Sequence, residues 1–301
     1  MREGAVIVVD WGSTRLRAWR ERPGSAELES LTAASGSLFD RSADLRADLE
    51  AHLAPWLPDA GLVLGAGMIG SRTGVIDAGY LELPAGPREW SRAGVRAGTV
   101  GGVSLVILPG VRATVPRADV IRGEELQVFA ALAAGEPDGT FTCPGTHSKW
   151  VTTGRGAITA FRTYATGELY AAWSQRSSLT DLLGSVTHEQ GGFLTGLDLA
   201  LAEDETLLSS IFALRALVLT EELEARHALD ALSGVLIGHE LRHALERRDD
   251  QGEVRILADA PLAGRYLEAL THLAVPARIV EPDTPRALLA LARGGAWGAD
   301  A

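Results

Sequence analysis

A single cysteine, Cys143, occurs in the 301 residues, so the chain cannot form an intrachain disulfide or a metal site built from several thiolates. Cys143 lies in an apolar segment, which favours a buried small side chain over a nucleophile. Long apolar runs are also lacking, because no stretch approaches the length of a transmembrane helix. The apolar run Val6–Val9 meets Asp10 at once and is too short for a signal peptide. From these features we expect a cytoplasmic protein.

Positive charge is scarce relative to negative charge, because 28 Lys and Arg face 39 Asp and Glu, for a net charge of −11. This balance argues against nucleic acid or an anionic membrane as the main partner. An anionic substrate would instead have to meet a local group of Arg, Lys or backbone N–H groups. The length and the 46% hydrophobic content suit two globular domains of about 150 residues each, which we place at residues 1–112 and 113–301.

The most informative stretch is Val6–Trp19, in which an apolar run ends in Asp10, a Gly12-Ser13-Thr14 turn follows and alternating residues resume. This pattern predicts a hairpin. Glycine permits the close approach of a ligand, and the consecutive N–H groups of such a turn bind anions. An Asp at the end of the first strand can hold Mg²⁺ through water. The alternative is an ordinary hairpin with an exposed Asp.

A second hairpin of the same design is predicted at Thr140–Thr152, where an apolar strand approaches the turn Gly145–Ser148 and another strand leaves through Trp150. Two such units indicate a duplicated domain with a phosphate-binding hairpin in each half. Strands that alternate with helices elsewhere predict an α/β fold with mixed sheets. The pattern resembles that of the actin-like (ribonuclease H-like), hexokinase-like superfamily, whose nucleotide-dependent sugar kinases have two similar domains with a cleft between them.

The segment Gly65–Gly79 is a candidate for a substrate site. It leaves the carboxyl end of a short apolar strand, which is the end at which α/β folds bind ligands. Ser71 and Arg72 could hydrogen-bond a polyol or a carboxylate. The alternative is a loop that only turns the chain.

Two adjacent carboxylates, Glu124 and Glu125, stand beside Arg122 at the start of a predicted helix. Acidic residues in a first helical turn also suit the helix dipole, so simple capping is the alternative. In a chain with two phosphate hairpins, one of these carboxylates is the best candidate for a general base that accepts the proton of a sugar hydroxyl. Adjacent helical side chains diverge by about 100°, so we expect only one of the pair to face the substrate.

Helical patterns occur at four further ranges, and some side chains near them carry specific expectations. Thr166 is a candidate N-cap. His239 and His243 have the i,i+4 spacing of zinc ligands, but no third ligand at metal-site spacing accompanies them, so we expect helix-surface histidines. The four predicted helices are Arg41–Trp56, Glu189–Leu201, Glu205–Leu219 and Glu222–Glu246.

Together these motifs resemble the 2-dehydro-3-deoxygalactonokinase family, bacterial sugar-acid kinases of the actin-like superfamily. The matches keep their order and spacing over nearly the whole chain. The matching stretches are DWGSTRLRAW (10–19), GAGMIGSRTG (65–74), YLELPAG (80–86), VIRGEELQ (120–127), PGTHSKWV (144–151), FRTYATGEL (161–169), SGVLIGHEL (233–241) and, less closely, RYLEAL (265–270).

The resemblance implies transfer of the ATP γ-phosphate to the 6-hydroxyl of 2-dehydro-3-deoxy-D-galactonate, in galactonate catabolism. Asp10 would hold Mg²⁺, and Arg122 would meet the substrate carboxylate. The resemblance does not fix the base, for which we choose Glu125, or else Glu124. The other implied residues are Gly12, Ser13 and Thr14 in the first phosphate turn, Gly145, Thr146, His147 and Lys149 in the second, and Met68, Ile69, Gly70 and Ser71 around the sugar acid.

The chain departs from the family pattern at Asp259-Ala260-Pro261, where a Gly-Thr-Ser turn near the adenosine is usual. A carboxylate there could accept from ribose hydroxyls or repel the phosphates, and the Pro removes one N–H donor. This departure motivates an alternative, a catalytically silent sensor of a sugar acid or nucleotide. A phosphatase acting on phosphate chains would want a longer basic channel, which the net charge disfavours. Galactonate-derived and gluconate-derived acids fit the sequence equally, and leucine-rich faces in residues 205–245 are compatible with a homodimer.

Overall fold

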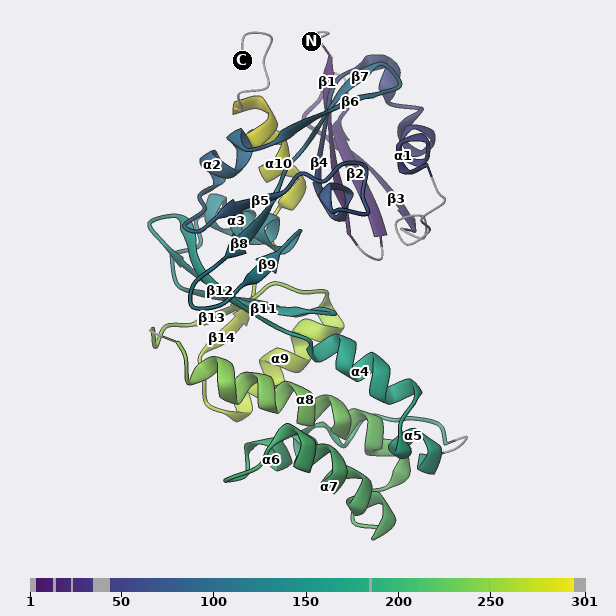
Figure 1. The fold of residues 1–301 in the computed structure, drawn as a ribbon, viewed down its shortest axis with the longest axis vertical. Coiled ribbons are helices and arrows are strands. Elements are labelled where there is room, and N and C mark those ends of the chain that lie inside the picture. The colour runs from purple at the N-terminus through teal and green to yellow at the C-terminus, as the bar shows by residue number, and fades with distance from the viewer. Residues whose placement is uncertain are drawn as a thin grey trace. The chain divides into compact units, whose positions relative to one another are not determined.

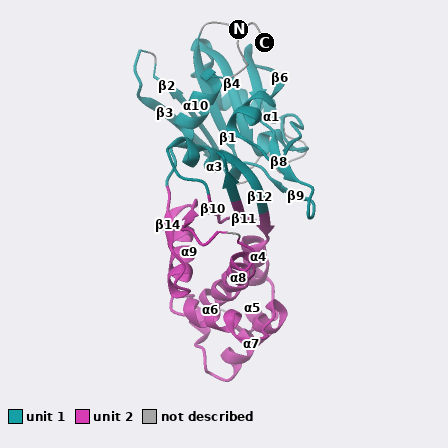
Figure 2. Ribbon diagram, turned by 90° about the vertical axis from the view of Figure 1, so that its left-hand side faces the viewer, with its two compact units in different colours: residues 1–138, 152–161, 281–301 teal, residues 139–151, 162–280 magenta. Residues whose placement is uncertain are grey.

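The computed structural model describes residues 4–12, 15–22, 24–34, 44–183, 186–248 and 250–294. The chain forms two compact units (Figure 2). Unit 1 comprises residues 1–138, 152–161 and 281–301, and unit 2 comprises residues 139–151 and 162–280. This division differs from the predicted boundary between residues 112 and 113. Residues 113–138 and the C-terminal segment belong to unit 1, because the helix of the C-terminal segment packs both on the helix of residues 113–138 and on the first strand.

Unit 1 is built on a six-stranded sheet with the order β3-β2-β1-β4-β7-β6 (Figure 1). The predicted first hairpin is confirmed, since β1 pairs antiparallel with β2, and β1 also pairs parallel with β4. Val, Ile and Leu fill β1 and β4 because central strands are covered on both faces. The strands are β1 (Ala5–Trp11), β2 (Arg15–Glu21), β3 (Leu28–Ala34), β4 (Ala60–Gly67), β6 (Val95–Val100) and β7 (Val103–Ile107).

Among the described residues, unit 1 also contains a small sheet and four α-helices. The small sheet contains β5 (Tyr80–Glu82), β8 (Gly110–Ala113) and β9 (Asp119–Ile121). The helices are α1 (Leu45–Leu53), α2 (Pro87–Arg92), α3 (Glu124–Ala133) and α10 (Thr284–Gly294). The predicted helix Arg41–Trp56 corresponds to α1, which begins after Asp44 because the Asp44 carboxylate accepts the N–H groups of Arg46 and Ala47. Residues 41–43 lie outside the described residues.

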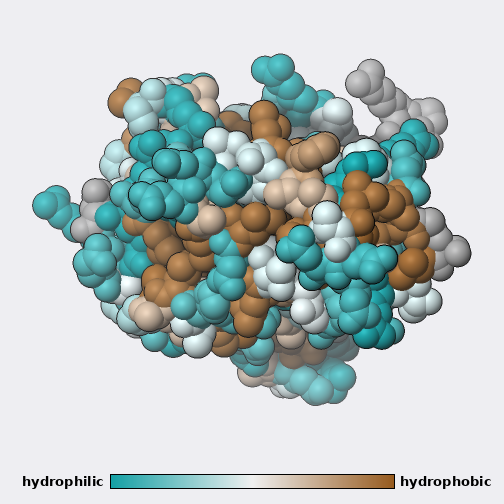
Figure 3. All heavy atoms as spheres, turned by 90° about the horizontal axis from the view of Figure 1, so that it is seen from below, coloured by the Kyte–Doolittle hydropathy of each residue, from teal (hydrophilic) through white to brown (hydrophobic). Residues whose placement is uncertain are grey.

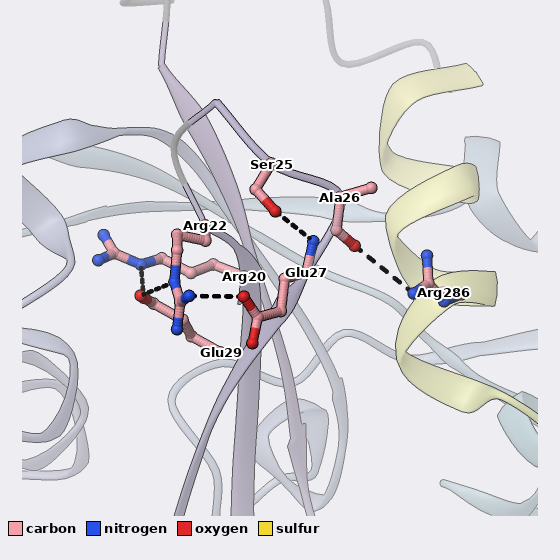
Figure 4. Close-up of polar contacts among 7 residues, drawn as sticks. All are labelled: Arg20, Arg22, Ser25, Ala26, Glu27, Glu29 and Arg286. Atoms are coloured by element: carbon pink, nitrogen blue, oxygen red, sulfur yellow. Dashed lines mark hydrogen bonds and ion pairs between the residues drawn. The ribbon is translucent and has the colours of Figure 1, made fainter.

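The edge of the six-stranded sheet at β3 carries a group of charged side chains (Figure 4). Glu29 on β3 accepts hydrogen bonds from Arg20 at 2.7 Å and from Arg22 at 3.3 Å, and the hydrogen bond from Arg20 is the main cause of its lowered pKa. Arg22 also donates to Glu27 at 2.5 Å, and Arg286 of α10 donates to the Ala26 carbonyl at 3.5 Å. Charges on an exposed edge strand disfavour pairing with another chain.

A five-stranded sheet in the second half of the chain, with residues 152–161 of two of its strands counted in unit 1, repeats the strand order of the first sheet. Its order β12-β11-β10-β13-β14 corresponds to β3-β2-β1-β4-β7, and β10 pairs parallel with β13 as β1 does with β4. This correspondence confirms the predicted duplication and the α/β class with mixed sheets. The strands are β10 (Thr140–Cys143), β11 (Ser148–Gly154), β12 (Ala157–Tyr164), β13 (Val254–Ile256) and β14 (Ala277–Ile279). Cys143 is 3% exposed, as expected for a buried small side chain.

Six helices of unit 2 lie among the described residues, and several begin later than the sequence pattern predicts. The predicted helix at Glu189 begins at Phe193, because Asp230 accepts the N–H groups of Gly191, Gly192 and Phe193 there. The one predicted at Glu222 begins at Ala228, after a short 3-10 turn. The helices are α4 (Thr166–Gln175), α5 (Ser178–Leu183), α6 (Phe193–Leu201), α7 (Leu207–Leu219), α8 (Ala228–Leu245) and α9 (Ala260–His272).

Helix α7 leaves large apolar side chains on the surface. Leu208 is 81% exposed, Phe212 66% and Leu219 52%. Figure 3 shows the molecule from below, which is the side on which Figure 1 draws α7. The hydrophobic areas of this surface are interrupted by hydrophilic ones. None of the described helices combines the length and hydropathy that crossing a bilayer demands.

Candidate active site

Asp10 lies near the end of β1, 7% exposed, in the position that the hairpin pattern predicts. The β1–β2 register places it opposite Arg17, whose NH2 group donates to Asp10 Oδ2 at 2.6 Å. Burial raises the pKa of Asp10, the Arg17 guanidinium lowers it in part, and the Glu124 carboxylate raises it further. The site therefore holds a buried acidic group. Its ionised form lacks hydration, and a cation would stabilise it.

The end of β4 approaches Asp10 closely at Gly67. Gly67 has a φ of +87°, and a Cβ there would stand 2.8 Å from the Trp11 carbonyl oxygen and 3.2 Å from Asp10 Oδ1. A larger residue would therefore displace the Asp10 carboxylate. Gly123 has a φ of +113°, and a Cβ on it would lie 3.9 Å from the Cα of Gly67, so the start of α3 approaches the same place.

Glu124 and Glu125 begin α3 and have different surroundings. Glu124 is half-buried, its Oε2 accepts the Arg122 N–H at 3.2 Å, and its charge acts on Asp10. Glu125 is 1% exposed, and its Oε2 accepts the Gly123 N–H at 2.6 Å. Among the described residues, its buried Oε1 has no hydrogen-bond partner. Burial, followed by the charge of Glu124, raises the pKa of Glu125 to about 8.

The raised pKa of Glu125 makes stability depend on pH. In the unfolded chain this carboxyl ionises near its ordinary value of 4.5, whereas the folded protein keeps the proton up to about pH 8. Unfolding releases a proton between these values, so the free energy of unfolding falls as the pH rises from about 4.5 to about 8. We expect the Tm of Glu125→Gln to fall less than that of the wild type over this range in thermal melts. Parallel Tm–pH curves for the two proteins would contradict this expectation.

Arg122 lies against the segment that the sequence assigns to the sugar acid. Its NH2 group donates to the Gly79 carbonyl at 2.7 Å, and its guanidinium lies 4.4 Å from the ring centroid of Tyr80. A Cβ on Gly70 would stand 2.9 Å from Arg122 NH1. The Nε and NH1 groups are buried and have no hydrogen-bond partner among the described residues. Unsatisfied N–H groups of a guanidinium are strong donors toward a carboxylate.

The neighbouring residues 68–71 form a tight turn after β4. Met68–Gly70 is a single 3-10 turn, and the Ile69 side chain packs in the core of unit 1 with no exposed surface. Met68 packs partly against the same core, and Ser71 Oγ lies 3.2 Å from Thr73 Oγ1. Of this set, Gly70 is the residue that directly borders the Arg122 guanidinium.

The first phosphate turn is described in part. The Gly12 N–H donates to the Arg15 carbonyl at 2.9 Å and thus closes the hairpin. Ser13 and Thr14, which the sequence assigns to this turn, lie outside the described residues.

The second phosphate turn rests on the first turn of α4. The Glu168 N–H donates to the Thr146 carbonyl at 2.9 Å, and the His147 ring contacts the Glu168 carboxylate at 2.8 Å. Gly167 permits this packing, since a Cβ there would stand 2.9 Å from the Cα of Thr146. Lys149, the only lysine in the sequence, donates to the His147 carbonyl at 2.8 Å.

The structure also describes the other side chains that the sequence singled out. Thr166 is not the N-cap of α4, because the cap position is Ala165 and the Thr166 hydroxyl donates to Glu240 instead. His239 contacts Ser210 and His243 contacts Tyr164. No group of three or more His, Cys, Asp or Glu side chains placed to hold a metal ion occurs among the described residues. Asp259 occupies the N-cap position of α9 and makes no side-chain cap hydrogen bond.

The repeated strand order and the acidic group at β1 and α3 define the class of the protein, an α/β kinase of the actin-like superfamily with two similar domains. The profile of the 2-keto-3-deoxy-galactonokinase family matches residues 10–291. The 2-dehydro-3-deoxygalactonokinase of Escherichia coli (strain K12) is 32% identical over 279 residues, which are 92% of this chain and 93% of the relative.

Two further relatives agree with this match. A protein of Rhizobium meliloti (strain 1021), named a probable 2-dehydro-3-deoxygalactonokinase, is 32% identical in an alignment of 303 positions that covers 98% of each chain. The crystal structure of a Sinorhizobium meliloti protein, to which the same enzyme name has been given provisionally, superposes on this chain with a TM-score of 0.85 at 30% identity. That alignment covers 96% of this chain and 98% of the other. The chain belongs to the 2-keto-3-deoxy-galactonokinase family.

The sequence did not point to Arg17, which donates to Asp10, or to Tyr80, whose ring lies against the Arg122 guanidinium. Arg17 had a usable signal, because Asp10 and Arg17 lie on opposite sides of a predicted turn and so can form a cross-strand pair. Tyr80 follows the glycine loop and had no such signal, since its contact with Arg122 spans 42 residues of sequence.

Proposed function

We propose that the protein transfers the γ-phosphate of ATP to the 6-hydroxyl of 2-dehydro-3-deoxy-D-galactonate in galactonate catabolism. The observation that carries this proposal is the grouping within unit 1 of Asp10, Glu124 and Arg122, whose guanidinium keeps two nitrogens without a hydrogen-bond partner among the described residues. These groups match the three needs of the reaction, which are cation binding, proton acceptance and carboxylate recognition. The family relationship supplies the substrate class.

Asp10 is the proposed ligand of Mg²⁺. Its surroundings fit a hard cation, because the group offers oxygen atoms alone and the nearby Glu124 charge makes the Asp10 carboxylate harder to ionise without a cation. When bound, Mg²⁺ would neutralise charge on the phosphates. Arg17 holds Asp10 Oδ2 and so leaves Oδ1, which faces Gly67, as the atom for this contact.

Glu124 is the proposed general base. As the new bond from O6 to phosphorus forms and the bond to the ADP oxygen breaks, a carboxylate must accept the O6 proton. The half-buried Glu124 can meet a substrate, whereas Glu125 is 1% exposed and is held by the Gly123 N–H. This choice favours the second of the two candidates that the sequence offered.

The remaining assignments concern binding. We assign the phosphates of ATP to Gly12, Ser13 and Thr14 and to Gly145, Thr146, His147 and Lys149, with Asp259 near the nucleotide. Among the residues around the sugar acid, Gly70 has the firmest support, because it borders the Arg122 guanidinium. Met68, Ile69 and Ser71 complete that proposed site.

The proposal is tested by ADP release from Mg-ATP with three acceptor conditions: the galactonate-derived acid, its gluconate-derived epimer and no acceptor. We expect turnover with the galactonate-derived acid and little without an acceptor. Turnover with the epimer alone would replace the substrate. ADP release that does not depend on either acid would overturn the kinase assignment.

Arg122→Ala tests carboxylate recognition. We expect the KM for the sugar acid to rise by about thirtyfold, because a charge-assisted pair to a carboxylate contributes about 2 kcal/mol. The KM for ATP should change little. The matched control is Arg112→Ala, which removes an arginine that pairs with Glu82 in the same small sheet at 2.5 Å. Equal effects of the two substitutions on the KM for the sugar acid would contradict the role of Arg122.

The silent-sensor alternative rests on the sequence departure at Asp259 and makes a different prediction in the same assay. A sensor would bind the acid or the nucleotide without acceptor-dependent ADP release. The homodimer and the cytoplasmic location stay predictions from the sequence.

A further inference from the structure

Glu240 is an acidic side chain within the core of unit 2. It lies on α8 and is 3% exposed. Four side chains donate to its carboxylate. Oε1 accepts from Ser148 Oγ at 2.7 Å and from Trp150 Nε1 at 2.8 Å, and Oε2 accepts from Tyr266 OH at 2.8 Å and from Thr166 Oγ1.

Both oxygens of the Glu240 carboxyl group are hydrogen-bonded. Four donors occupy its acceptor sites, and the Trp150 indole N–H cannot act as an acceptor. Burial raises the pKa of Glu240, and the hydrogen bonds from Thr166, Ser148, Trp150 and Tyr266 lower it in part. Ser148, Thr166 and Tyr266 contribute hydroxyl groups, which can donate or accept, so the network satisfies both oxygens of the Glu240 carboxyl group. A buried carboxylate is costly unless it is fully hydrogen-bonded, and this one is.

The donors of Glu240 come from the elements that bear the second phosphate turn. Ser148 directly follows residues 145–147 and begins β11, and Thr166 begins α4. The turn itself lies on α4, through the hydrogen bond from Glu168 N–H to the Thr146 carbonyl. Glu240 therefore connects the outgoing strand of the hairpin to the helix that supports the turn.

The residues of this hydrogen-bond network come from four of the sequence motifs on which the family resemblance rests. PGTHSKWV contributes Ser148 and Trp150, FRTYATGEL contributes Thr166, SGVLIGHEL contributes Glu240 and RYLEAL contributes Tyr266. The last two motifs had no assigned role in the proposed reaction. Their side chains meet at one buried point beneath the phosphate turn.

We propose that Glu240 is a positioning residue for nucleotide binding, which holds the turn 145–148 against α4 in the geometry that receives the phosphates of ATP. This inference rests on the proposed function, since it requires that the turn binds phosphate. It assigns Glu240 no contact with substrate.

The test compares Glu240→Gln with Asp230→Asn, another substitution of a hydrogen-bonded acidic residue on α8. Asp230 is 8% exposed, pairs with Arg265 and accepts three N–H groups at the start of α6, away from the phosphate turn. In Glu240→Gln an amide NH₂ group replaces one carboxyl oxygen, so the side chains that donated to this oxygen lose their acceptor. We expect the KM for Mg-ATP and the Kd for a fluorescent ADP analogue to rise about tenfold, the equivalent of about 1.4 kcal/mol.

A merely structural role predicts a different pattern. It would lower the Tm of both variants and leave nucleotide binding alike in both. We expect instead that Asp230→Asn lowers the Tm but changes the Kd for the ADP analogue by less than about twofold, and that the KM for the sugar acid stays unchanged in both variants.

A second substitution keeps the proposal testable where Glu240→Gln fails to fold. Tyr266→Phe removes one donor and keeps the ring in the core, and we expect a rise of about threefold in the Kd for the ADP analogue. Unchanged nucleotide binding in a folded Glu240→Gln or Tyr266→Phe variant overturns the role of Glu240. A wild-type protein that does not bind the ADP analogue would instead overturn the proposed function itself.

Discussion

Glu124→Gln is expected to lower kcat by about a thousandfold, the usual contribution of a positioned general base. The amide keeps the volume and can still accept the Arg122 N–H, but it cannot take up the proton of the sugar 6-hydroxyl. The KM for ATP should change little, because this group acts on the acceptor and not on the nucleotide. Steady-state kinetics at saturating ATP measure the effect.

The matched control is the same substitution at the neighbouring residue, Glu125→Gln. At pH 7 a carboxyl group with a pKa of about 8 is largely protonated, so Glu125→Gln exchanges one neutral group for another of the same shape. We expect its kcat to stay within about fivefold of the wild type. A large loss in Glu125→Gln together with a small loss in Glu124→Gln would return the role of base to Glu125, and kcat would then rise with pH up to about 8.

Asp10→Asn is the second substitution with a large expected effect, a loss of about a thousandfold in kcat/KM for ATP, because electrostatic stabilisation supplies much of phosphoryl transfer. Stability should not fall with activity. Burial raises the pKa of Asp10, so its ionised form costs stability, and the Arg17 side chain is 42% exposed and can be hydrated when the pair is lost. Thermal melts should therefore give an unchanged or higher Tm.

Glu29→Gln is the control for Asp10→Asn, because Glu29 also pairs with an arginine of β2, at 2.7 Å from Arg20. The hydrogen bond from Arg20 lowers the pKa of Glu29, so this carboxylate stabilises the fold when ionised. We expect the opposite pattern, a lower Tm with full activity. Activity in Asp10→Asn that equals the wild type over a titration of Mg²⁺ would remove Asp10 from the mechanism.

The two hairpins were the part of the fold that the sequence predicted best. Apolar runs that stop at Asp10 and at Gly145 carry local signals of strand and turn, and β1, β2, β10 and β11 occur there. The sequence also predicted that residues 122–127 open a helix, and α3 begins there at Glu124, after Gly123 with its positive φ.

Contacts between distant segments were not predictable in the same way. Helix α6 begins at Phe193 because Asp230, far along the chain, accepts the N–H groups at its start. Likewise, α10 packs with α3 and β1 in unit 1 although it lies at the other end of the sequence. Patterns within a window carry no information on such partners.

Within the candidate site, residue types were predicted better than their surroundings. The sequence singled out Glu124 and Glu125 equally, and only the fold separates the half-buried side chain from the buried one. Glu240 shows the same limit, because its four hydrogen-bond donors come from three separate stretches of sequence.

The central claim, phosphoryl transfer to a sugar acid, is tested most directly by identifying the product with ³¹P NMR after incubation with Mg-ATP and 2-dehydro-3-deoxy-D-galactonate. The account predicts ADP and one phosphate monoester whose phosphorus couples to the protons on C6. Inorganic phosphate in place of the monoester, or a monoester at another carbon, would contradict it.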